Sequence, residues 1–145
     1  IKMFIRDFQL DETITYKKNP EKYTRNLICK EGNKYALILI CWAPNSISPI
    51  HDHESECCFK IISGSLHEYT YEINNNKLIK SSESIYNNGE IGHINDDKGV
   101  HSMENLSDDY SLSLHLYIPA NLEATVYLDI NNAKKNKKSK MTFDI

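Results

Sequence analysis

At 145 residues and 40% hydrophobic composition, the chain is long enough to bury a single core in one compact domain. Its formal net charge of −3 at pH 7 gives no electrostatic footprint for nucleic acid, so no nucleic-acid partner is expected. The sequence lacks a run of about 18 apolar residues, and residues 1–7 are too charged for a signal peptide, so we expect neither a membrane partner nor a secretory leader.

Strand signals in the first half of the chain alternate with turn residues. Residues 35–42, YALILICW, form a continuous apolar run that is typical of a strand buried on both faces. A second strand is predicted over residues 58–62, which a Ser-Gly pair ends. Residues 66–73 alternate between polar and apolar side chains, and the asparagines that follow predict a hairpin turn into residues 77–79.

The second half of the chain continues the same pattern. Turn residues at 87–90 lead into a short strand at 91–94, and the closing strands are predicted at 110–118, 124–130 and 140–143. Helix is expected only within residues 1–22. Many short strands at regular spacing predict an all-β fold, either an antiparallel barrel or a sandwich.

A basic run, KKNKKSK at residues 134–140, stands between two of these strand segments. Clustered lysines can bind an anionic partner, but a charged run between strands is more often a solvated turn. We therefore interpret residues 134–140 as an exposed turn.

Three histidines indicate a metal site: His51 and His53, separated by one residue, and His101 later in the chain. On a strand, residues i and i+2 point to the same face, so a His-x-His triplet directs two imidazoles at one point. A third histidine from another strand would complete a facial triad and leave coordination positions open for a substrate and for water or dioxygen. His67 and His93 lie outside this pattern, and we interpret them as structural residues.

The spacing around the histidines is similar to that of the cupin metal motifs. In cupins, His-x-His is followed by Glu and then by Gly, and here Cys57 and Gly64 occupy those two positions. The second cupin motif ends in His, three residues and Asn, which matches His101 and Asn105, although DDKG at residues 96–99 replaces the usual Pro-x-Gly. The resemblance implies a cupin-type antiparallel β-barrel or jelly-roll sandwich.

Within the cupins, the chain resembles the cysteine dioxygenase family from about Tyr23 to its C-terminus. The stretches that carry the resemblance are YTRNL at 23–27, CW at 41–42, IHDH at 50–53, IND at 94–96 and SLHLY at 113–117. Family members carry a longer helical segment before the first of these motifs. We therefore expect a short, mostly helical and truncated N-terminal segment, residues 1–22, followed by a cupin catalytic domain, residues 23–145.

The resemblance implies an iron enzyme that adds both oxygens of dioxygen to the sulfur of free L-cysteine, giving cysteine sulfinate. Fe(II) would be bound by His51, His53 and His101, and three neutral imidazoles would leave the full positive charge on the ion. Arg25 would hold the substrate carboxylate with its planar guanidinium. Tyr23, two residues earlier, would contact the same carboxylate or support the arginine.

Ser113, His115 and Tyr117 alternate along one predicted strand and therefore share a face. In the family this trio lies beside the metal, with the serine and histidine linked by hydrogen bonds to the tyrosine hydroxyl. The hydroxyl could then donate to dioxygen or to the substrate oxygen. By the same resemblance, the peptide bond between Ile118 and Pro119 is expected to be cis.

Animal members of the family carry a covalent bond between a cysteine sulfur and the ring of the tyrosine that corresponds to Tyr117. Two adjacent residues are candidates here, because the loop after His53 is one residue shorter than in those relatives. Counting forward from His53 selects Cys58, whereas counting back from Gly64 selects Cys57. Strand register is stiffer than loop length, so we predict a thioether link between Cys57 and Tyr117, with Cys58 on the opposite face.

The other two cysteines, Cys29 and Cys41, stand in apolar surroundings, where a free cysteine packs as a small hydrophobe. No Cys-x-x-Cys pair is present, and the vicinal pair Cys57 and Cys58 cannot form a relaxed disulfide. Reduced thiols beside a ferrous site indicate a reducing compartment, and we expect the cytoplasm.

Two other functions stay open at this point. A dioxygenase for another small thiol, 3-mercaptopropionate, would use the same site, but such relatives tend to lack both the arginine and the cysteine. A non-catalytic metal-binding cupin would explain the histidines but not the joint presence of Arg25, Cys57 and Tyr117. Nothing in the sequence indicates an interface, so we expect a monomer whose partners are L-cysteine and dioxygen.

Overall fold

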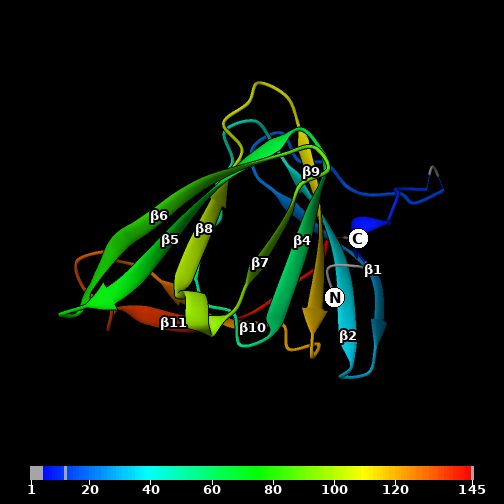
Figure 1. The fold of residues 1–145 in the computed structure, drawn as a ribbon. Coiled ribbons are helices and arrows are strands. Elements are labelled where there is room, and N and C mark those ends of the chain that lie inside the picture. Colours follow the sequence, from blue (N-terminus) through cyan, green and yellow to red (C-terminus); the bar gives the residue numbers. More distant parts are fainter. Residues whose placement is uncertain (1–4, 12, 145) are drawn as a thin grey trace.

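The fold consists of two antiparallel β-sheets that lie face to face (Figure 1). The computed structural model describes residues 5–11 and 13–144, without the side chain of Asp96. Helical backbone is almost absent from the described residues. The strands and the loops between them therefore position the candidate site residues.

The five-stranded sheet consists of β1 (Thr24–Glu31), β2 (Tyr35–Trp42), β4 (Glu56–Ser63), β7 (Ile91–Ile94) and β9 (Ser111–Ile118). The six-stranded sheet consists of β3 (Ile50–His51), β5 (Ser65–Asn74), β6 (Lys77–Asn87), β8 (Val100–Glu104), β10 (Glu123–Tyr127) and β11 (Asn136–Lys140). A single turn of 3-10 helix, η1 (Asp96–Lys98), joins β7 to β8. The strand orders are β1-β2-β9-β4-β7 and β11-β10-β3-β8-β5-β6.

The core lies between the two sheets and is set by the alternation of side chains along each strand. The apolar run of β2 is buried on both faces, as predicted. Its residues Ile38, Ile40 and Trp42 point between the sheets and pack with residues of both. The alternate residues belong to a second cluster on the outer face of the five-stranded sheet: Leu37, Leu39 and Cys41.

The predicted N-terminal helix is wrong for the part of residues 1–22 that the structure describes. Only residues 5–6 have helical backbone, and no helix is long and apolar enough to cross a membrane anywhere in the described chain. Apolar side chains of the segment pack on the outer face of the five-stranded sheet. The carbonyl oxygen of Phe8 accepts a hydrogen bond from Lys60 Nζ at 2.9 Å. The segment that we predicted to be helical is thus held by apolar packing on the sheet and by a hydrogen bond to it.

The barrel form of the predicted fold is also wrong, whereas the sandwich form is confirmed. No β-ladder joins the two sheets among the described residues. The outer edge of β1 bonds a C-terminal residue instead. Asp144 N donates to Arg25 O at 2.8 Å, and Asp144 Oδ2 accepts from Arg25 N at 2.9 Å. The C-terminal residues thereby take the place that a strand of the other sheet would need.

The exposed turn predicted at residues 134–140 is confirmed only for residues 134–135. Residues 136–140 form β11, an edge strand paired with β10, and the strand predicted at 140–143 ends at Lys140. The lysines of β11 are exposed. Charged side chains on an edge strand discourage pairing with another chain. This protection explains why lysines gather here without an anionic partner.

Gly92 on β7 gives a test of the core packing. It is paired with Phe59 on β4, and a Cβ built on Gly92 would overlap the Phe59 ring. Phe59 is fully buried between the rings of Tyr86 and His115, so it cannot move aside easily. We expect Gly92→Ala to lower the free energy of unfolding by about 1–3 kcal/mol, measured by urea denaturation.

A Phe59→Leu background provides the control for this prediction. Leucine removes the ring that the new methyl group would meet, so Gly92→Ala should cost clearly less there than in the wild type. An equal cost in both backgrounds would show that the overlap with Phe59 is not the cause.

Candidate metal centre

The three predicted ligands come together at one point in the six-stranded sheet. His51 ends β3 and is paired directly with His101 on β8. His53 lies just beyond β3, where the flanking Asp52 exchanges hydrogen bonds with Thr125 on β10. Nitrogen atoms of the three imidazoles all lie within 4.8 Å of one another, which is close enough for them to bind one ion. Strand pairing therefore positions two ligands, and the Asp52 contacts position the third.

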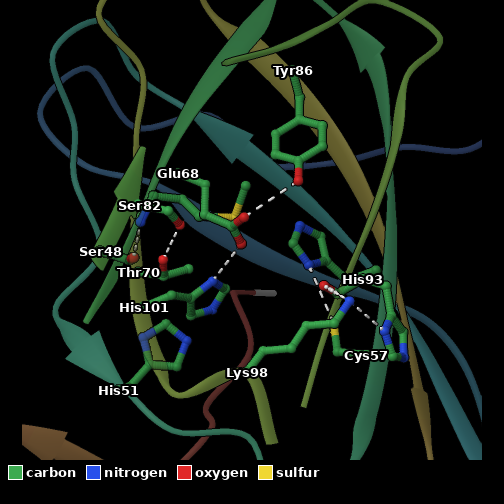
Figure 2. Close-up of polar contacts among 12 residues, drawn as sticks. Ser48, His51, Cys57, Glu68, Thr70, Ser82, Tyr86, His93, Lys98 and His101 are labelled. Atoms are coloured by element: carbon green, nitrogen blue, oxygen red, sulfur yellow. Dashed lines mark hydrogen bonds and ion pairs between the residues drawn. The ribbon is translucent and has the colours of Figure 1, made fainter. Parts of the chain in front are cut away.

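Two of the imidazoles are oriented by hydrogen bonds at Nδ1. His51 Nδ1 lies 2.7 Å from the carbonyl oxygen of Pro49, which can only accept, so this nitrogen carries the proton. His101 Nδ1 lies 2.8 Å from Oε2 of Glu68, a contact visible in Figure 2. With Nδ1 occupied in both rings, Nε2 is the nitrogen left to bind a metal ion.

The protein environment keeps the imidazoles of His51 and His53 neutral. Desolvation, with a smaller contribution from His101, lowers the pKa of His51 to about 3. The same two causes lower the pKa of His53 far below its usual range. Neutral imidazoles have a free lone pair, and such a nitrogen donor set fits a divalent transition metal ion.

A pocket opens beside the histidine cluster, and residues of both sheets line it. Besides the three histidines, its walls include Tyr23, Arg25, Trp42, His115 and Tyr117. Four of these five residues were singled out in the sequence as substrate or catalytic residues. The metal ligands and those candidates therefore share one cavity.

Arg25 reaches the pocket from β1 with its side chain braced by aromatic rings. Its Nη2 donates to the Tyr23 hydroxyl at 3.2 Å, and the guanidinium carbon lies 5.2 Å from the centre of the Tyr23 ring. The Tyr23 ring in turn contacts Trp42, with ring centres 5.0 Å apart. The guanidinium forms no ion pair with a carboxylate among residues 5–11 and 13–144. It is thus a braced cation that can still receive an anion.

The alternating trio on β9 is buried and hydrogen-bonded, but not entirely as expected. Trp42 Nε1 donates to Ser113 Oγ at 2.8 Å, and Ser113 Oγ lies 2.8 Å from His115 Nε2. If the serine hydroxyl donates to Nε2, the proton of His115 is on Nδ1. That nitrogen faces the Cys57 sulfur at 3.9 Å, and no hydrogen bond from His115 to Tyr117 occurs in the described chain. The peptide bond after Ile118 is cis, as predicted.

The register of β4 against β9 separates the two adjacent cysteines. Cys57 pairs directly with Tyr117 and lies in the cluster between the sheets, whereas Cys58 packs on the outer face of the five-stranded sheet. Burial raises the pKa of the Cys57 thiol and the pKa of the Tyr117 hydroxyl well above their usual ranges, and the two groups interact with each other. The predicted register is confirmed. The sulfur that could reach the Tyr117 ring belongs to Cys57.

Two smaller predictions about thiols and histidines can be compared with the structure. Cys41 is buried as expected, whereas Cys29, which follows a bulge in the pairing of β1 with β2, is exposed. All four cysteines are free. His93 bonds Glu56 away from the cluster, and His67 pairs with Glu104 across the strands, so both remain structural residues.

Fold and site together define a cupin with a metal-capable centre. The cupin domain of Cnp3 from Schizosaccharomyces pombe superposes with a TM-score of 0.59 at 10% identity, covering 76% of this chain and 72% of that domain. The TT1209 structure from Thermus thermophilus gives a TM-score of 0.58 at 20% identity, covering 72% of this chain and 90% of that chain. Similarity at these identities shows the fold alone.

Sequence comparison assigns the chain to a family within that fold. The family model for cysteine dioxygenase type I matches residues 9–128, and the chain belongs to this family. Cysteine dioxygenase type 1 from Bos taurus is 36% identical over 121 residues, which is 80% of this chain and 60% of that protein. The human protein is 35% identical over 127 residues, covering 84% and 62%. The chain thus spans 60–62% of the length of these curated relatives.

Replacing His51, His53 or His101 with alanine tests the metal centre. Each variant should lose most of its bound metal, because a site with three protein ligands has none to spare. Metal content of purified protein, measured by plasma mass spectrometry, reports the loss directly. His67→Ala and His93→Ala serve as controls and should keep wild-type metal content. Full metal occupancy in any of the three ligand variants would contradict the assignment.

Proposed function

We propose that this protein is an iron-dependent thiol dioxygenase that converts L-cysteine and dioxygen to cysteine sulfinate. The observation that carries the proposal is the opening of the three-histidine cluster and the Arg25 guanidinium into one pocket. Membership of the cysteine dioxygenase type I family supports the same reaction. Fe(II) bound by the three imidazoles would supply the redox and spin chemistry that side chains cannot provide.

Arg25 is proposed to bind the carboxylate of the amino acid. Its planar guanidinium can form two parallel hydrogen bonds with a carboxylate, and the Tyr23 hydroxyl at 3.2 Å from Nη2 fixes the side chain in place. Arg25 and the histidines lie on opposite sheets, so a small substrate could span the distance between them. Held at both ends, the substrate would lose little further entropy on the way to reaction.

Tyr117 and His115 are proposed to hold protons at the pocket wall. Burial raises the pKa of Tyr117, so its hydroxyl keeps its proton and can donate a hydrogen bond to a substrate oxygen. Burial lowers the pKa of His115 to about 3, so its ring stays neutral. A hydrogen bond donated by the Ser113 hydroxyl to Nε2 would place the His115 proton on Nδ1, which faces the Cys57 sulfur at 3.9 Å. Ser113 therefore acts on the pocket through His115.

The pocket also carries apolar residues that would limit water around the reacting groups. Ile40 and Met103 come from the two facing sheets, and Leu122 and Met141 come from the loops after β9 and β11. Exclusion of water strengthens the hydrogen bonds and charges that hold the substrate.

We further propose that the protein works in a reducing compartment, the cytoplasm, because its substrate would be a reduced thiol and its four cysteines are free. We also propose that it is a monomer.

Oxygen consumption with a set of thiols tests the proposed reaction. The iron-loaded protein should consume dioxygen with L-cysteine faster than with 3-mercaptopropionate, which lacks the amine, or cysteamine, which lacks the carboxylate. A preference for 3-mercaptopropionate would identify an enzyme for another small thiol. An iron-loaded protein that consumes no oxygen with any of them would be a non-catalytic metal-binding cupin.

Substitution of Arg25 tests the carboxylate contact. Arg25→Ala should raise KM for L-cysteine roughly ten- to hundredfold, because a hydrogen-bonded charged contact contributes about 1.5–3 kcal/mol. Turnover of cysteamine should change little, since it has no carboxylate to lose. Arg6→Ala is the matched control, because the Arg6 side chain is exposed and bonds only the neighbouring Asp7 among the described residues. An unchanged KM for cysteine would rule out Arg25 as the anchor.

A thioether between Cys57 and Tyr117 is a further prediction of the proposed function. Oxidation by dioxygen at the metal would join the Cys57 sulfur to the ring carbon beside the Tyr117 hydroxyl, with two protons released and two electrons passed to dioxygen. Peptide mass mapping of aerobically turned-over protein should find the linked peptides lighter by two hydrogens. Cys57→Ser should abolish this species and Cys58→Ser should leave it intact. A link that persists in Cys57→Ser and disappears in Cys58→Ser would contradict the register argument.

A further inference from the structure

Glu68 is a buried carboxylate beside the histidine cluster to which no role has yet been assigned. It lies on β5 and is only 5% exposed. Its Oε2 accepts a hydrogen bond from His101 Nδ1 at 2.8 Å, and its Oε1 accepts one from the Tyr86 hydroxyl at 3.4 Å (Figure 2). Each oxygen therefore has its own partner, one on β8 and one on β6.

A positive charge on the far side of the His101 ring would offset this buried carboxylate. An ionised carboxylate inside a protein is costly unless a cation offsets it, and a phenol hydroxyl such as that of Tyr86 carries no full charge. His101 can provide this positive charge in two ways. Either a proton or a metal ion occupies Nε2, the nitrogen on the far side of the ring from Glu68. Because Nε2 faces the other two histidines, a metal ion there offsets Glu68 and is bound by all three rings.

We infer that Glu68 is a positioning residue for the metal centre, an inference that rests on the three-histidine site of the proposed function. Its carboxylate holds His101 with Nε2 directed at the ion and makes this imidazole a stronger donor. It also places one negative charge a single ring away from the ion. The site is then less positive than three imidazoles alone would make it.

The other oriented ligand shows why Glu68 is distinctive. His51 Nδ1 is bound by the carbonyl of Pro49, a neutral acceptor, at 2.7 Å. His101 Nδ1 is bound by a carboxylate at 2.8 Å. Backbone carbonyl and carboxylate both fix the tautomer, but only the carboxylate adds charge. Loss of Glu68 should therefore weaken metal binding and favour the lower oxidation state, since a negative charge stabilises the more positive ion.

Metal affinity and reduction potential of Glu68→Gln test the inference without any measurement of turnover. Glutamine keeps the shape and an acceptor oxygen but removes the charge. Anaerobic chelator competition should show Fe(II) bound roughly ten- to hundredfold more weakly than by the wild type. Spectroelectrochemistry should show a higher Fe(III)/Fe(II) potential. Glu68→Asp, which restores the charge on a shorter side chain, should recover part of both losses.

A second carboxylate in the same region provides a matched control. Glu104 lies on β8 three residues after His101, and it bonds the Tyr69 hydroxyl at 2.9 Å rather than a metal-ligand candidate. Glu104→Gln should leave both metal affinity and potential unchanged. If folded Glu68→Gln has the same Fe(II) affinity and the same reduction potential as the wild type, the inference about Glu68 is wrong, but the three-histidine site is unaffected. A wild-type protein that binds no metal would overturn the three-histidine site and the inference with it.

Nuclear magnetic resonance of the wild type gives an answer even if the Glu68 variants do not fold. In Zn(II)-loaded protein labelled with 15N-histidine, His101 should bind the ion through Nε2 and show a slowly exchanging proton on Nδ1. Coordination of His101 through Nδ1 would overturn the inference, because that nitrogen could not then donate to Glu68.

Discussion

The pairing of the two-residue strand β3 with β8 is the constraint on which the site depends. One antiparallel pair places His51 opposite His101, fifty residues away in the sequence, and β10 holds β3 from its other side through Val126 and Tyr127. A strand this short has few hydrogen bonds of its own, so its register is imposed by its two neighbours. A slip of one residue would turn His51 away from the other imidazoles. The metal centre is therefore a property of the sheet as a whole.

The facing sheet supplies the chemistry that surrounds those imidazoles. Its inward side chains alternate along three adjacent strands, so that Trp42 of β2, Ser113 of β9 and Cys57 of β4 meet in one buried layer. Hydrogen bonds run from Trp42 through Ser113 to His115 and end at the Cys57 sulfur. Such a layer is rigid because each polar group is held by a neighbour on another strand. Rigid placement is what an anchored substrate requires.

Features set within a single strand could be predicted from the sequence, whereas contacts between segments that are distant in the sequence could not. Alternation along single strands predicted the burial of β2 and the opposite facing of Cys57 and Cys58, since both follow from strand geometry alone. The N-terminal segment was misread because its contacts are with the outer face of a sheet formed much later in the chain. The contact between His115 and Cys57 joins two strands, and no local pattern reports it. A signal for Glu68 did exist: it stands two residues after Leu66, on the buried face of its strand.

The distribution of charge around the pocket connects the proposed substrate with the buried carboxylate. Arg25 is in the pocket wall, whereas Glu68 is behind His101 and is not among the residues that line the pocket. A bound amino acid would therefore meet a positive group at one end and the ion at the other, without contacting the negative charge that offsets the ion. If Glu68 instead faced the pocket, it would repel the substrate carboxylate and thiolate. Placing the carboxylate one imidazole behind the site allows it to tune the metal and still leaves the cavity attractive to an anion.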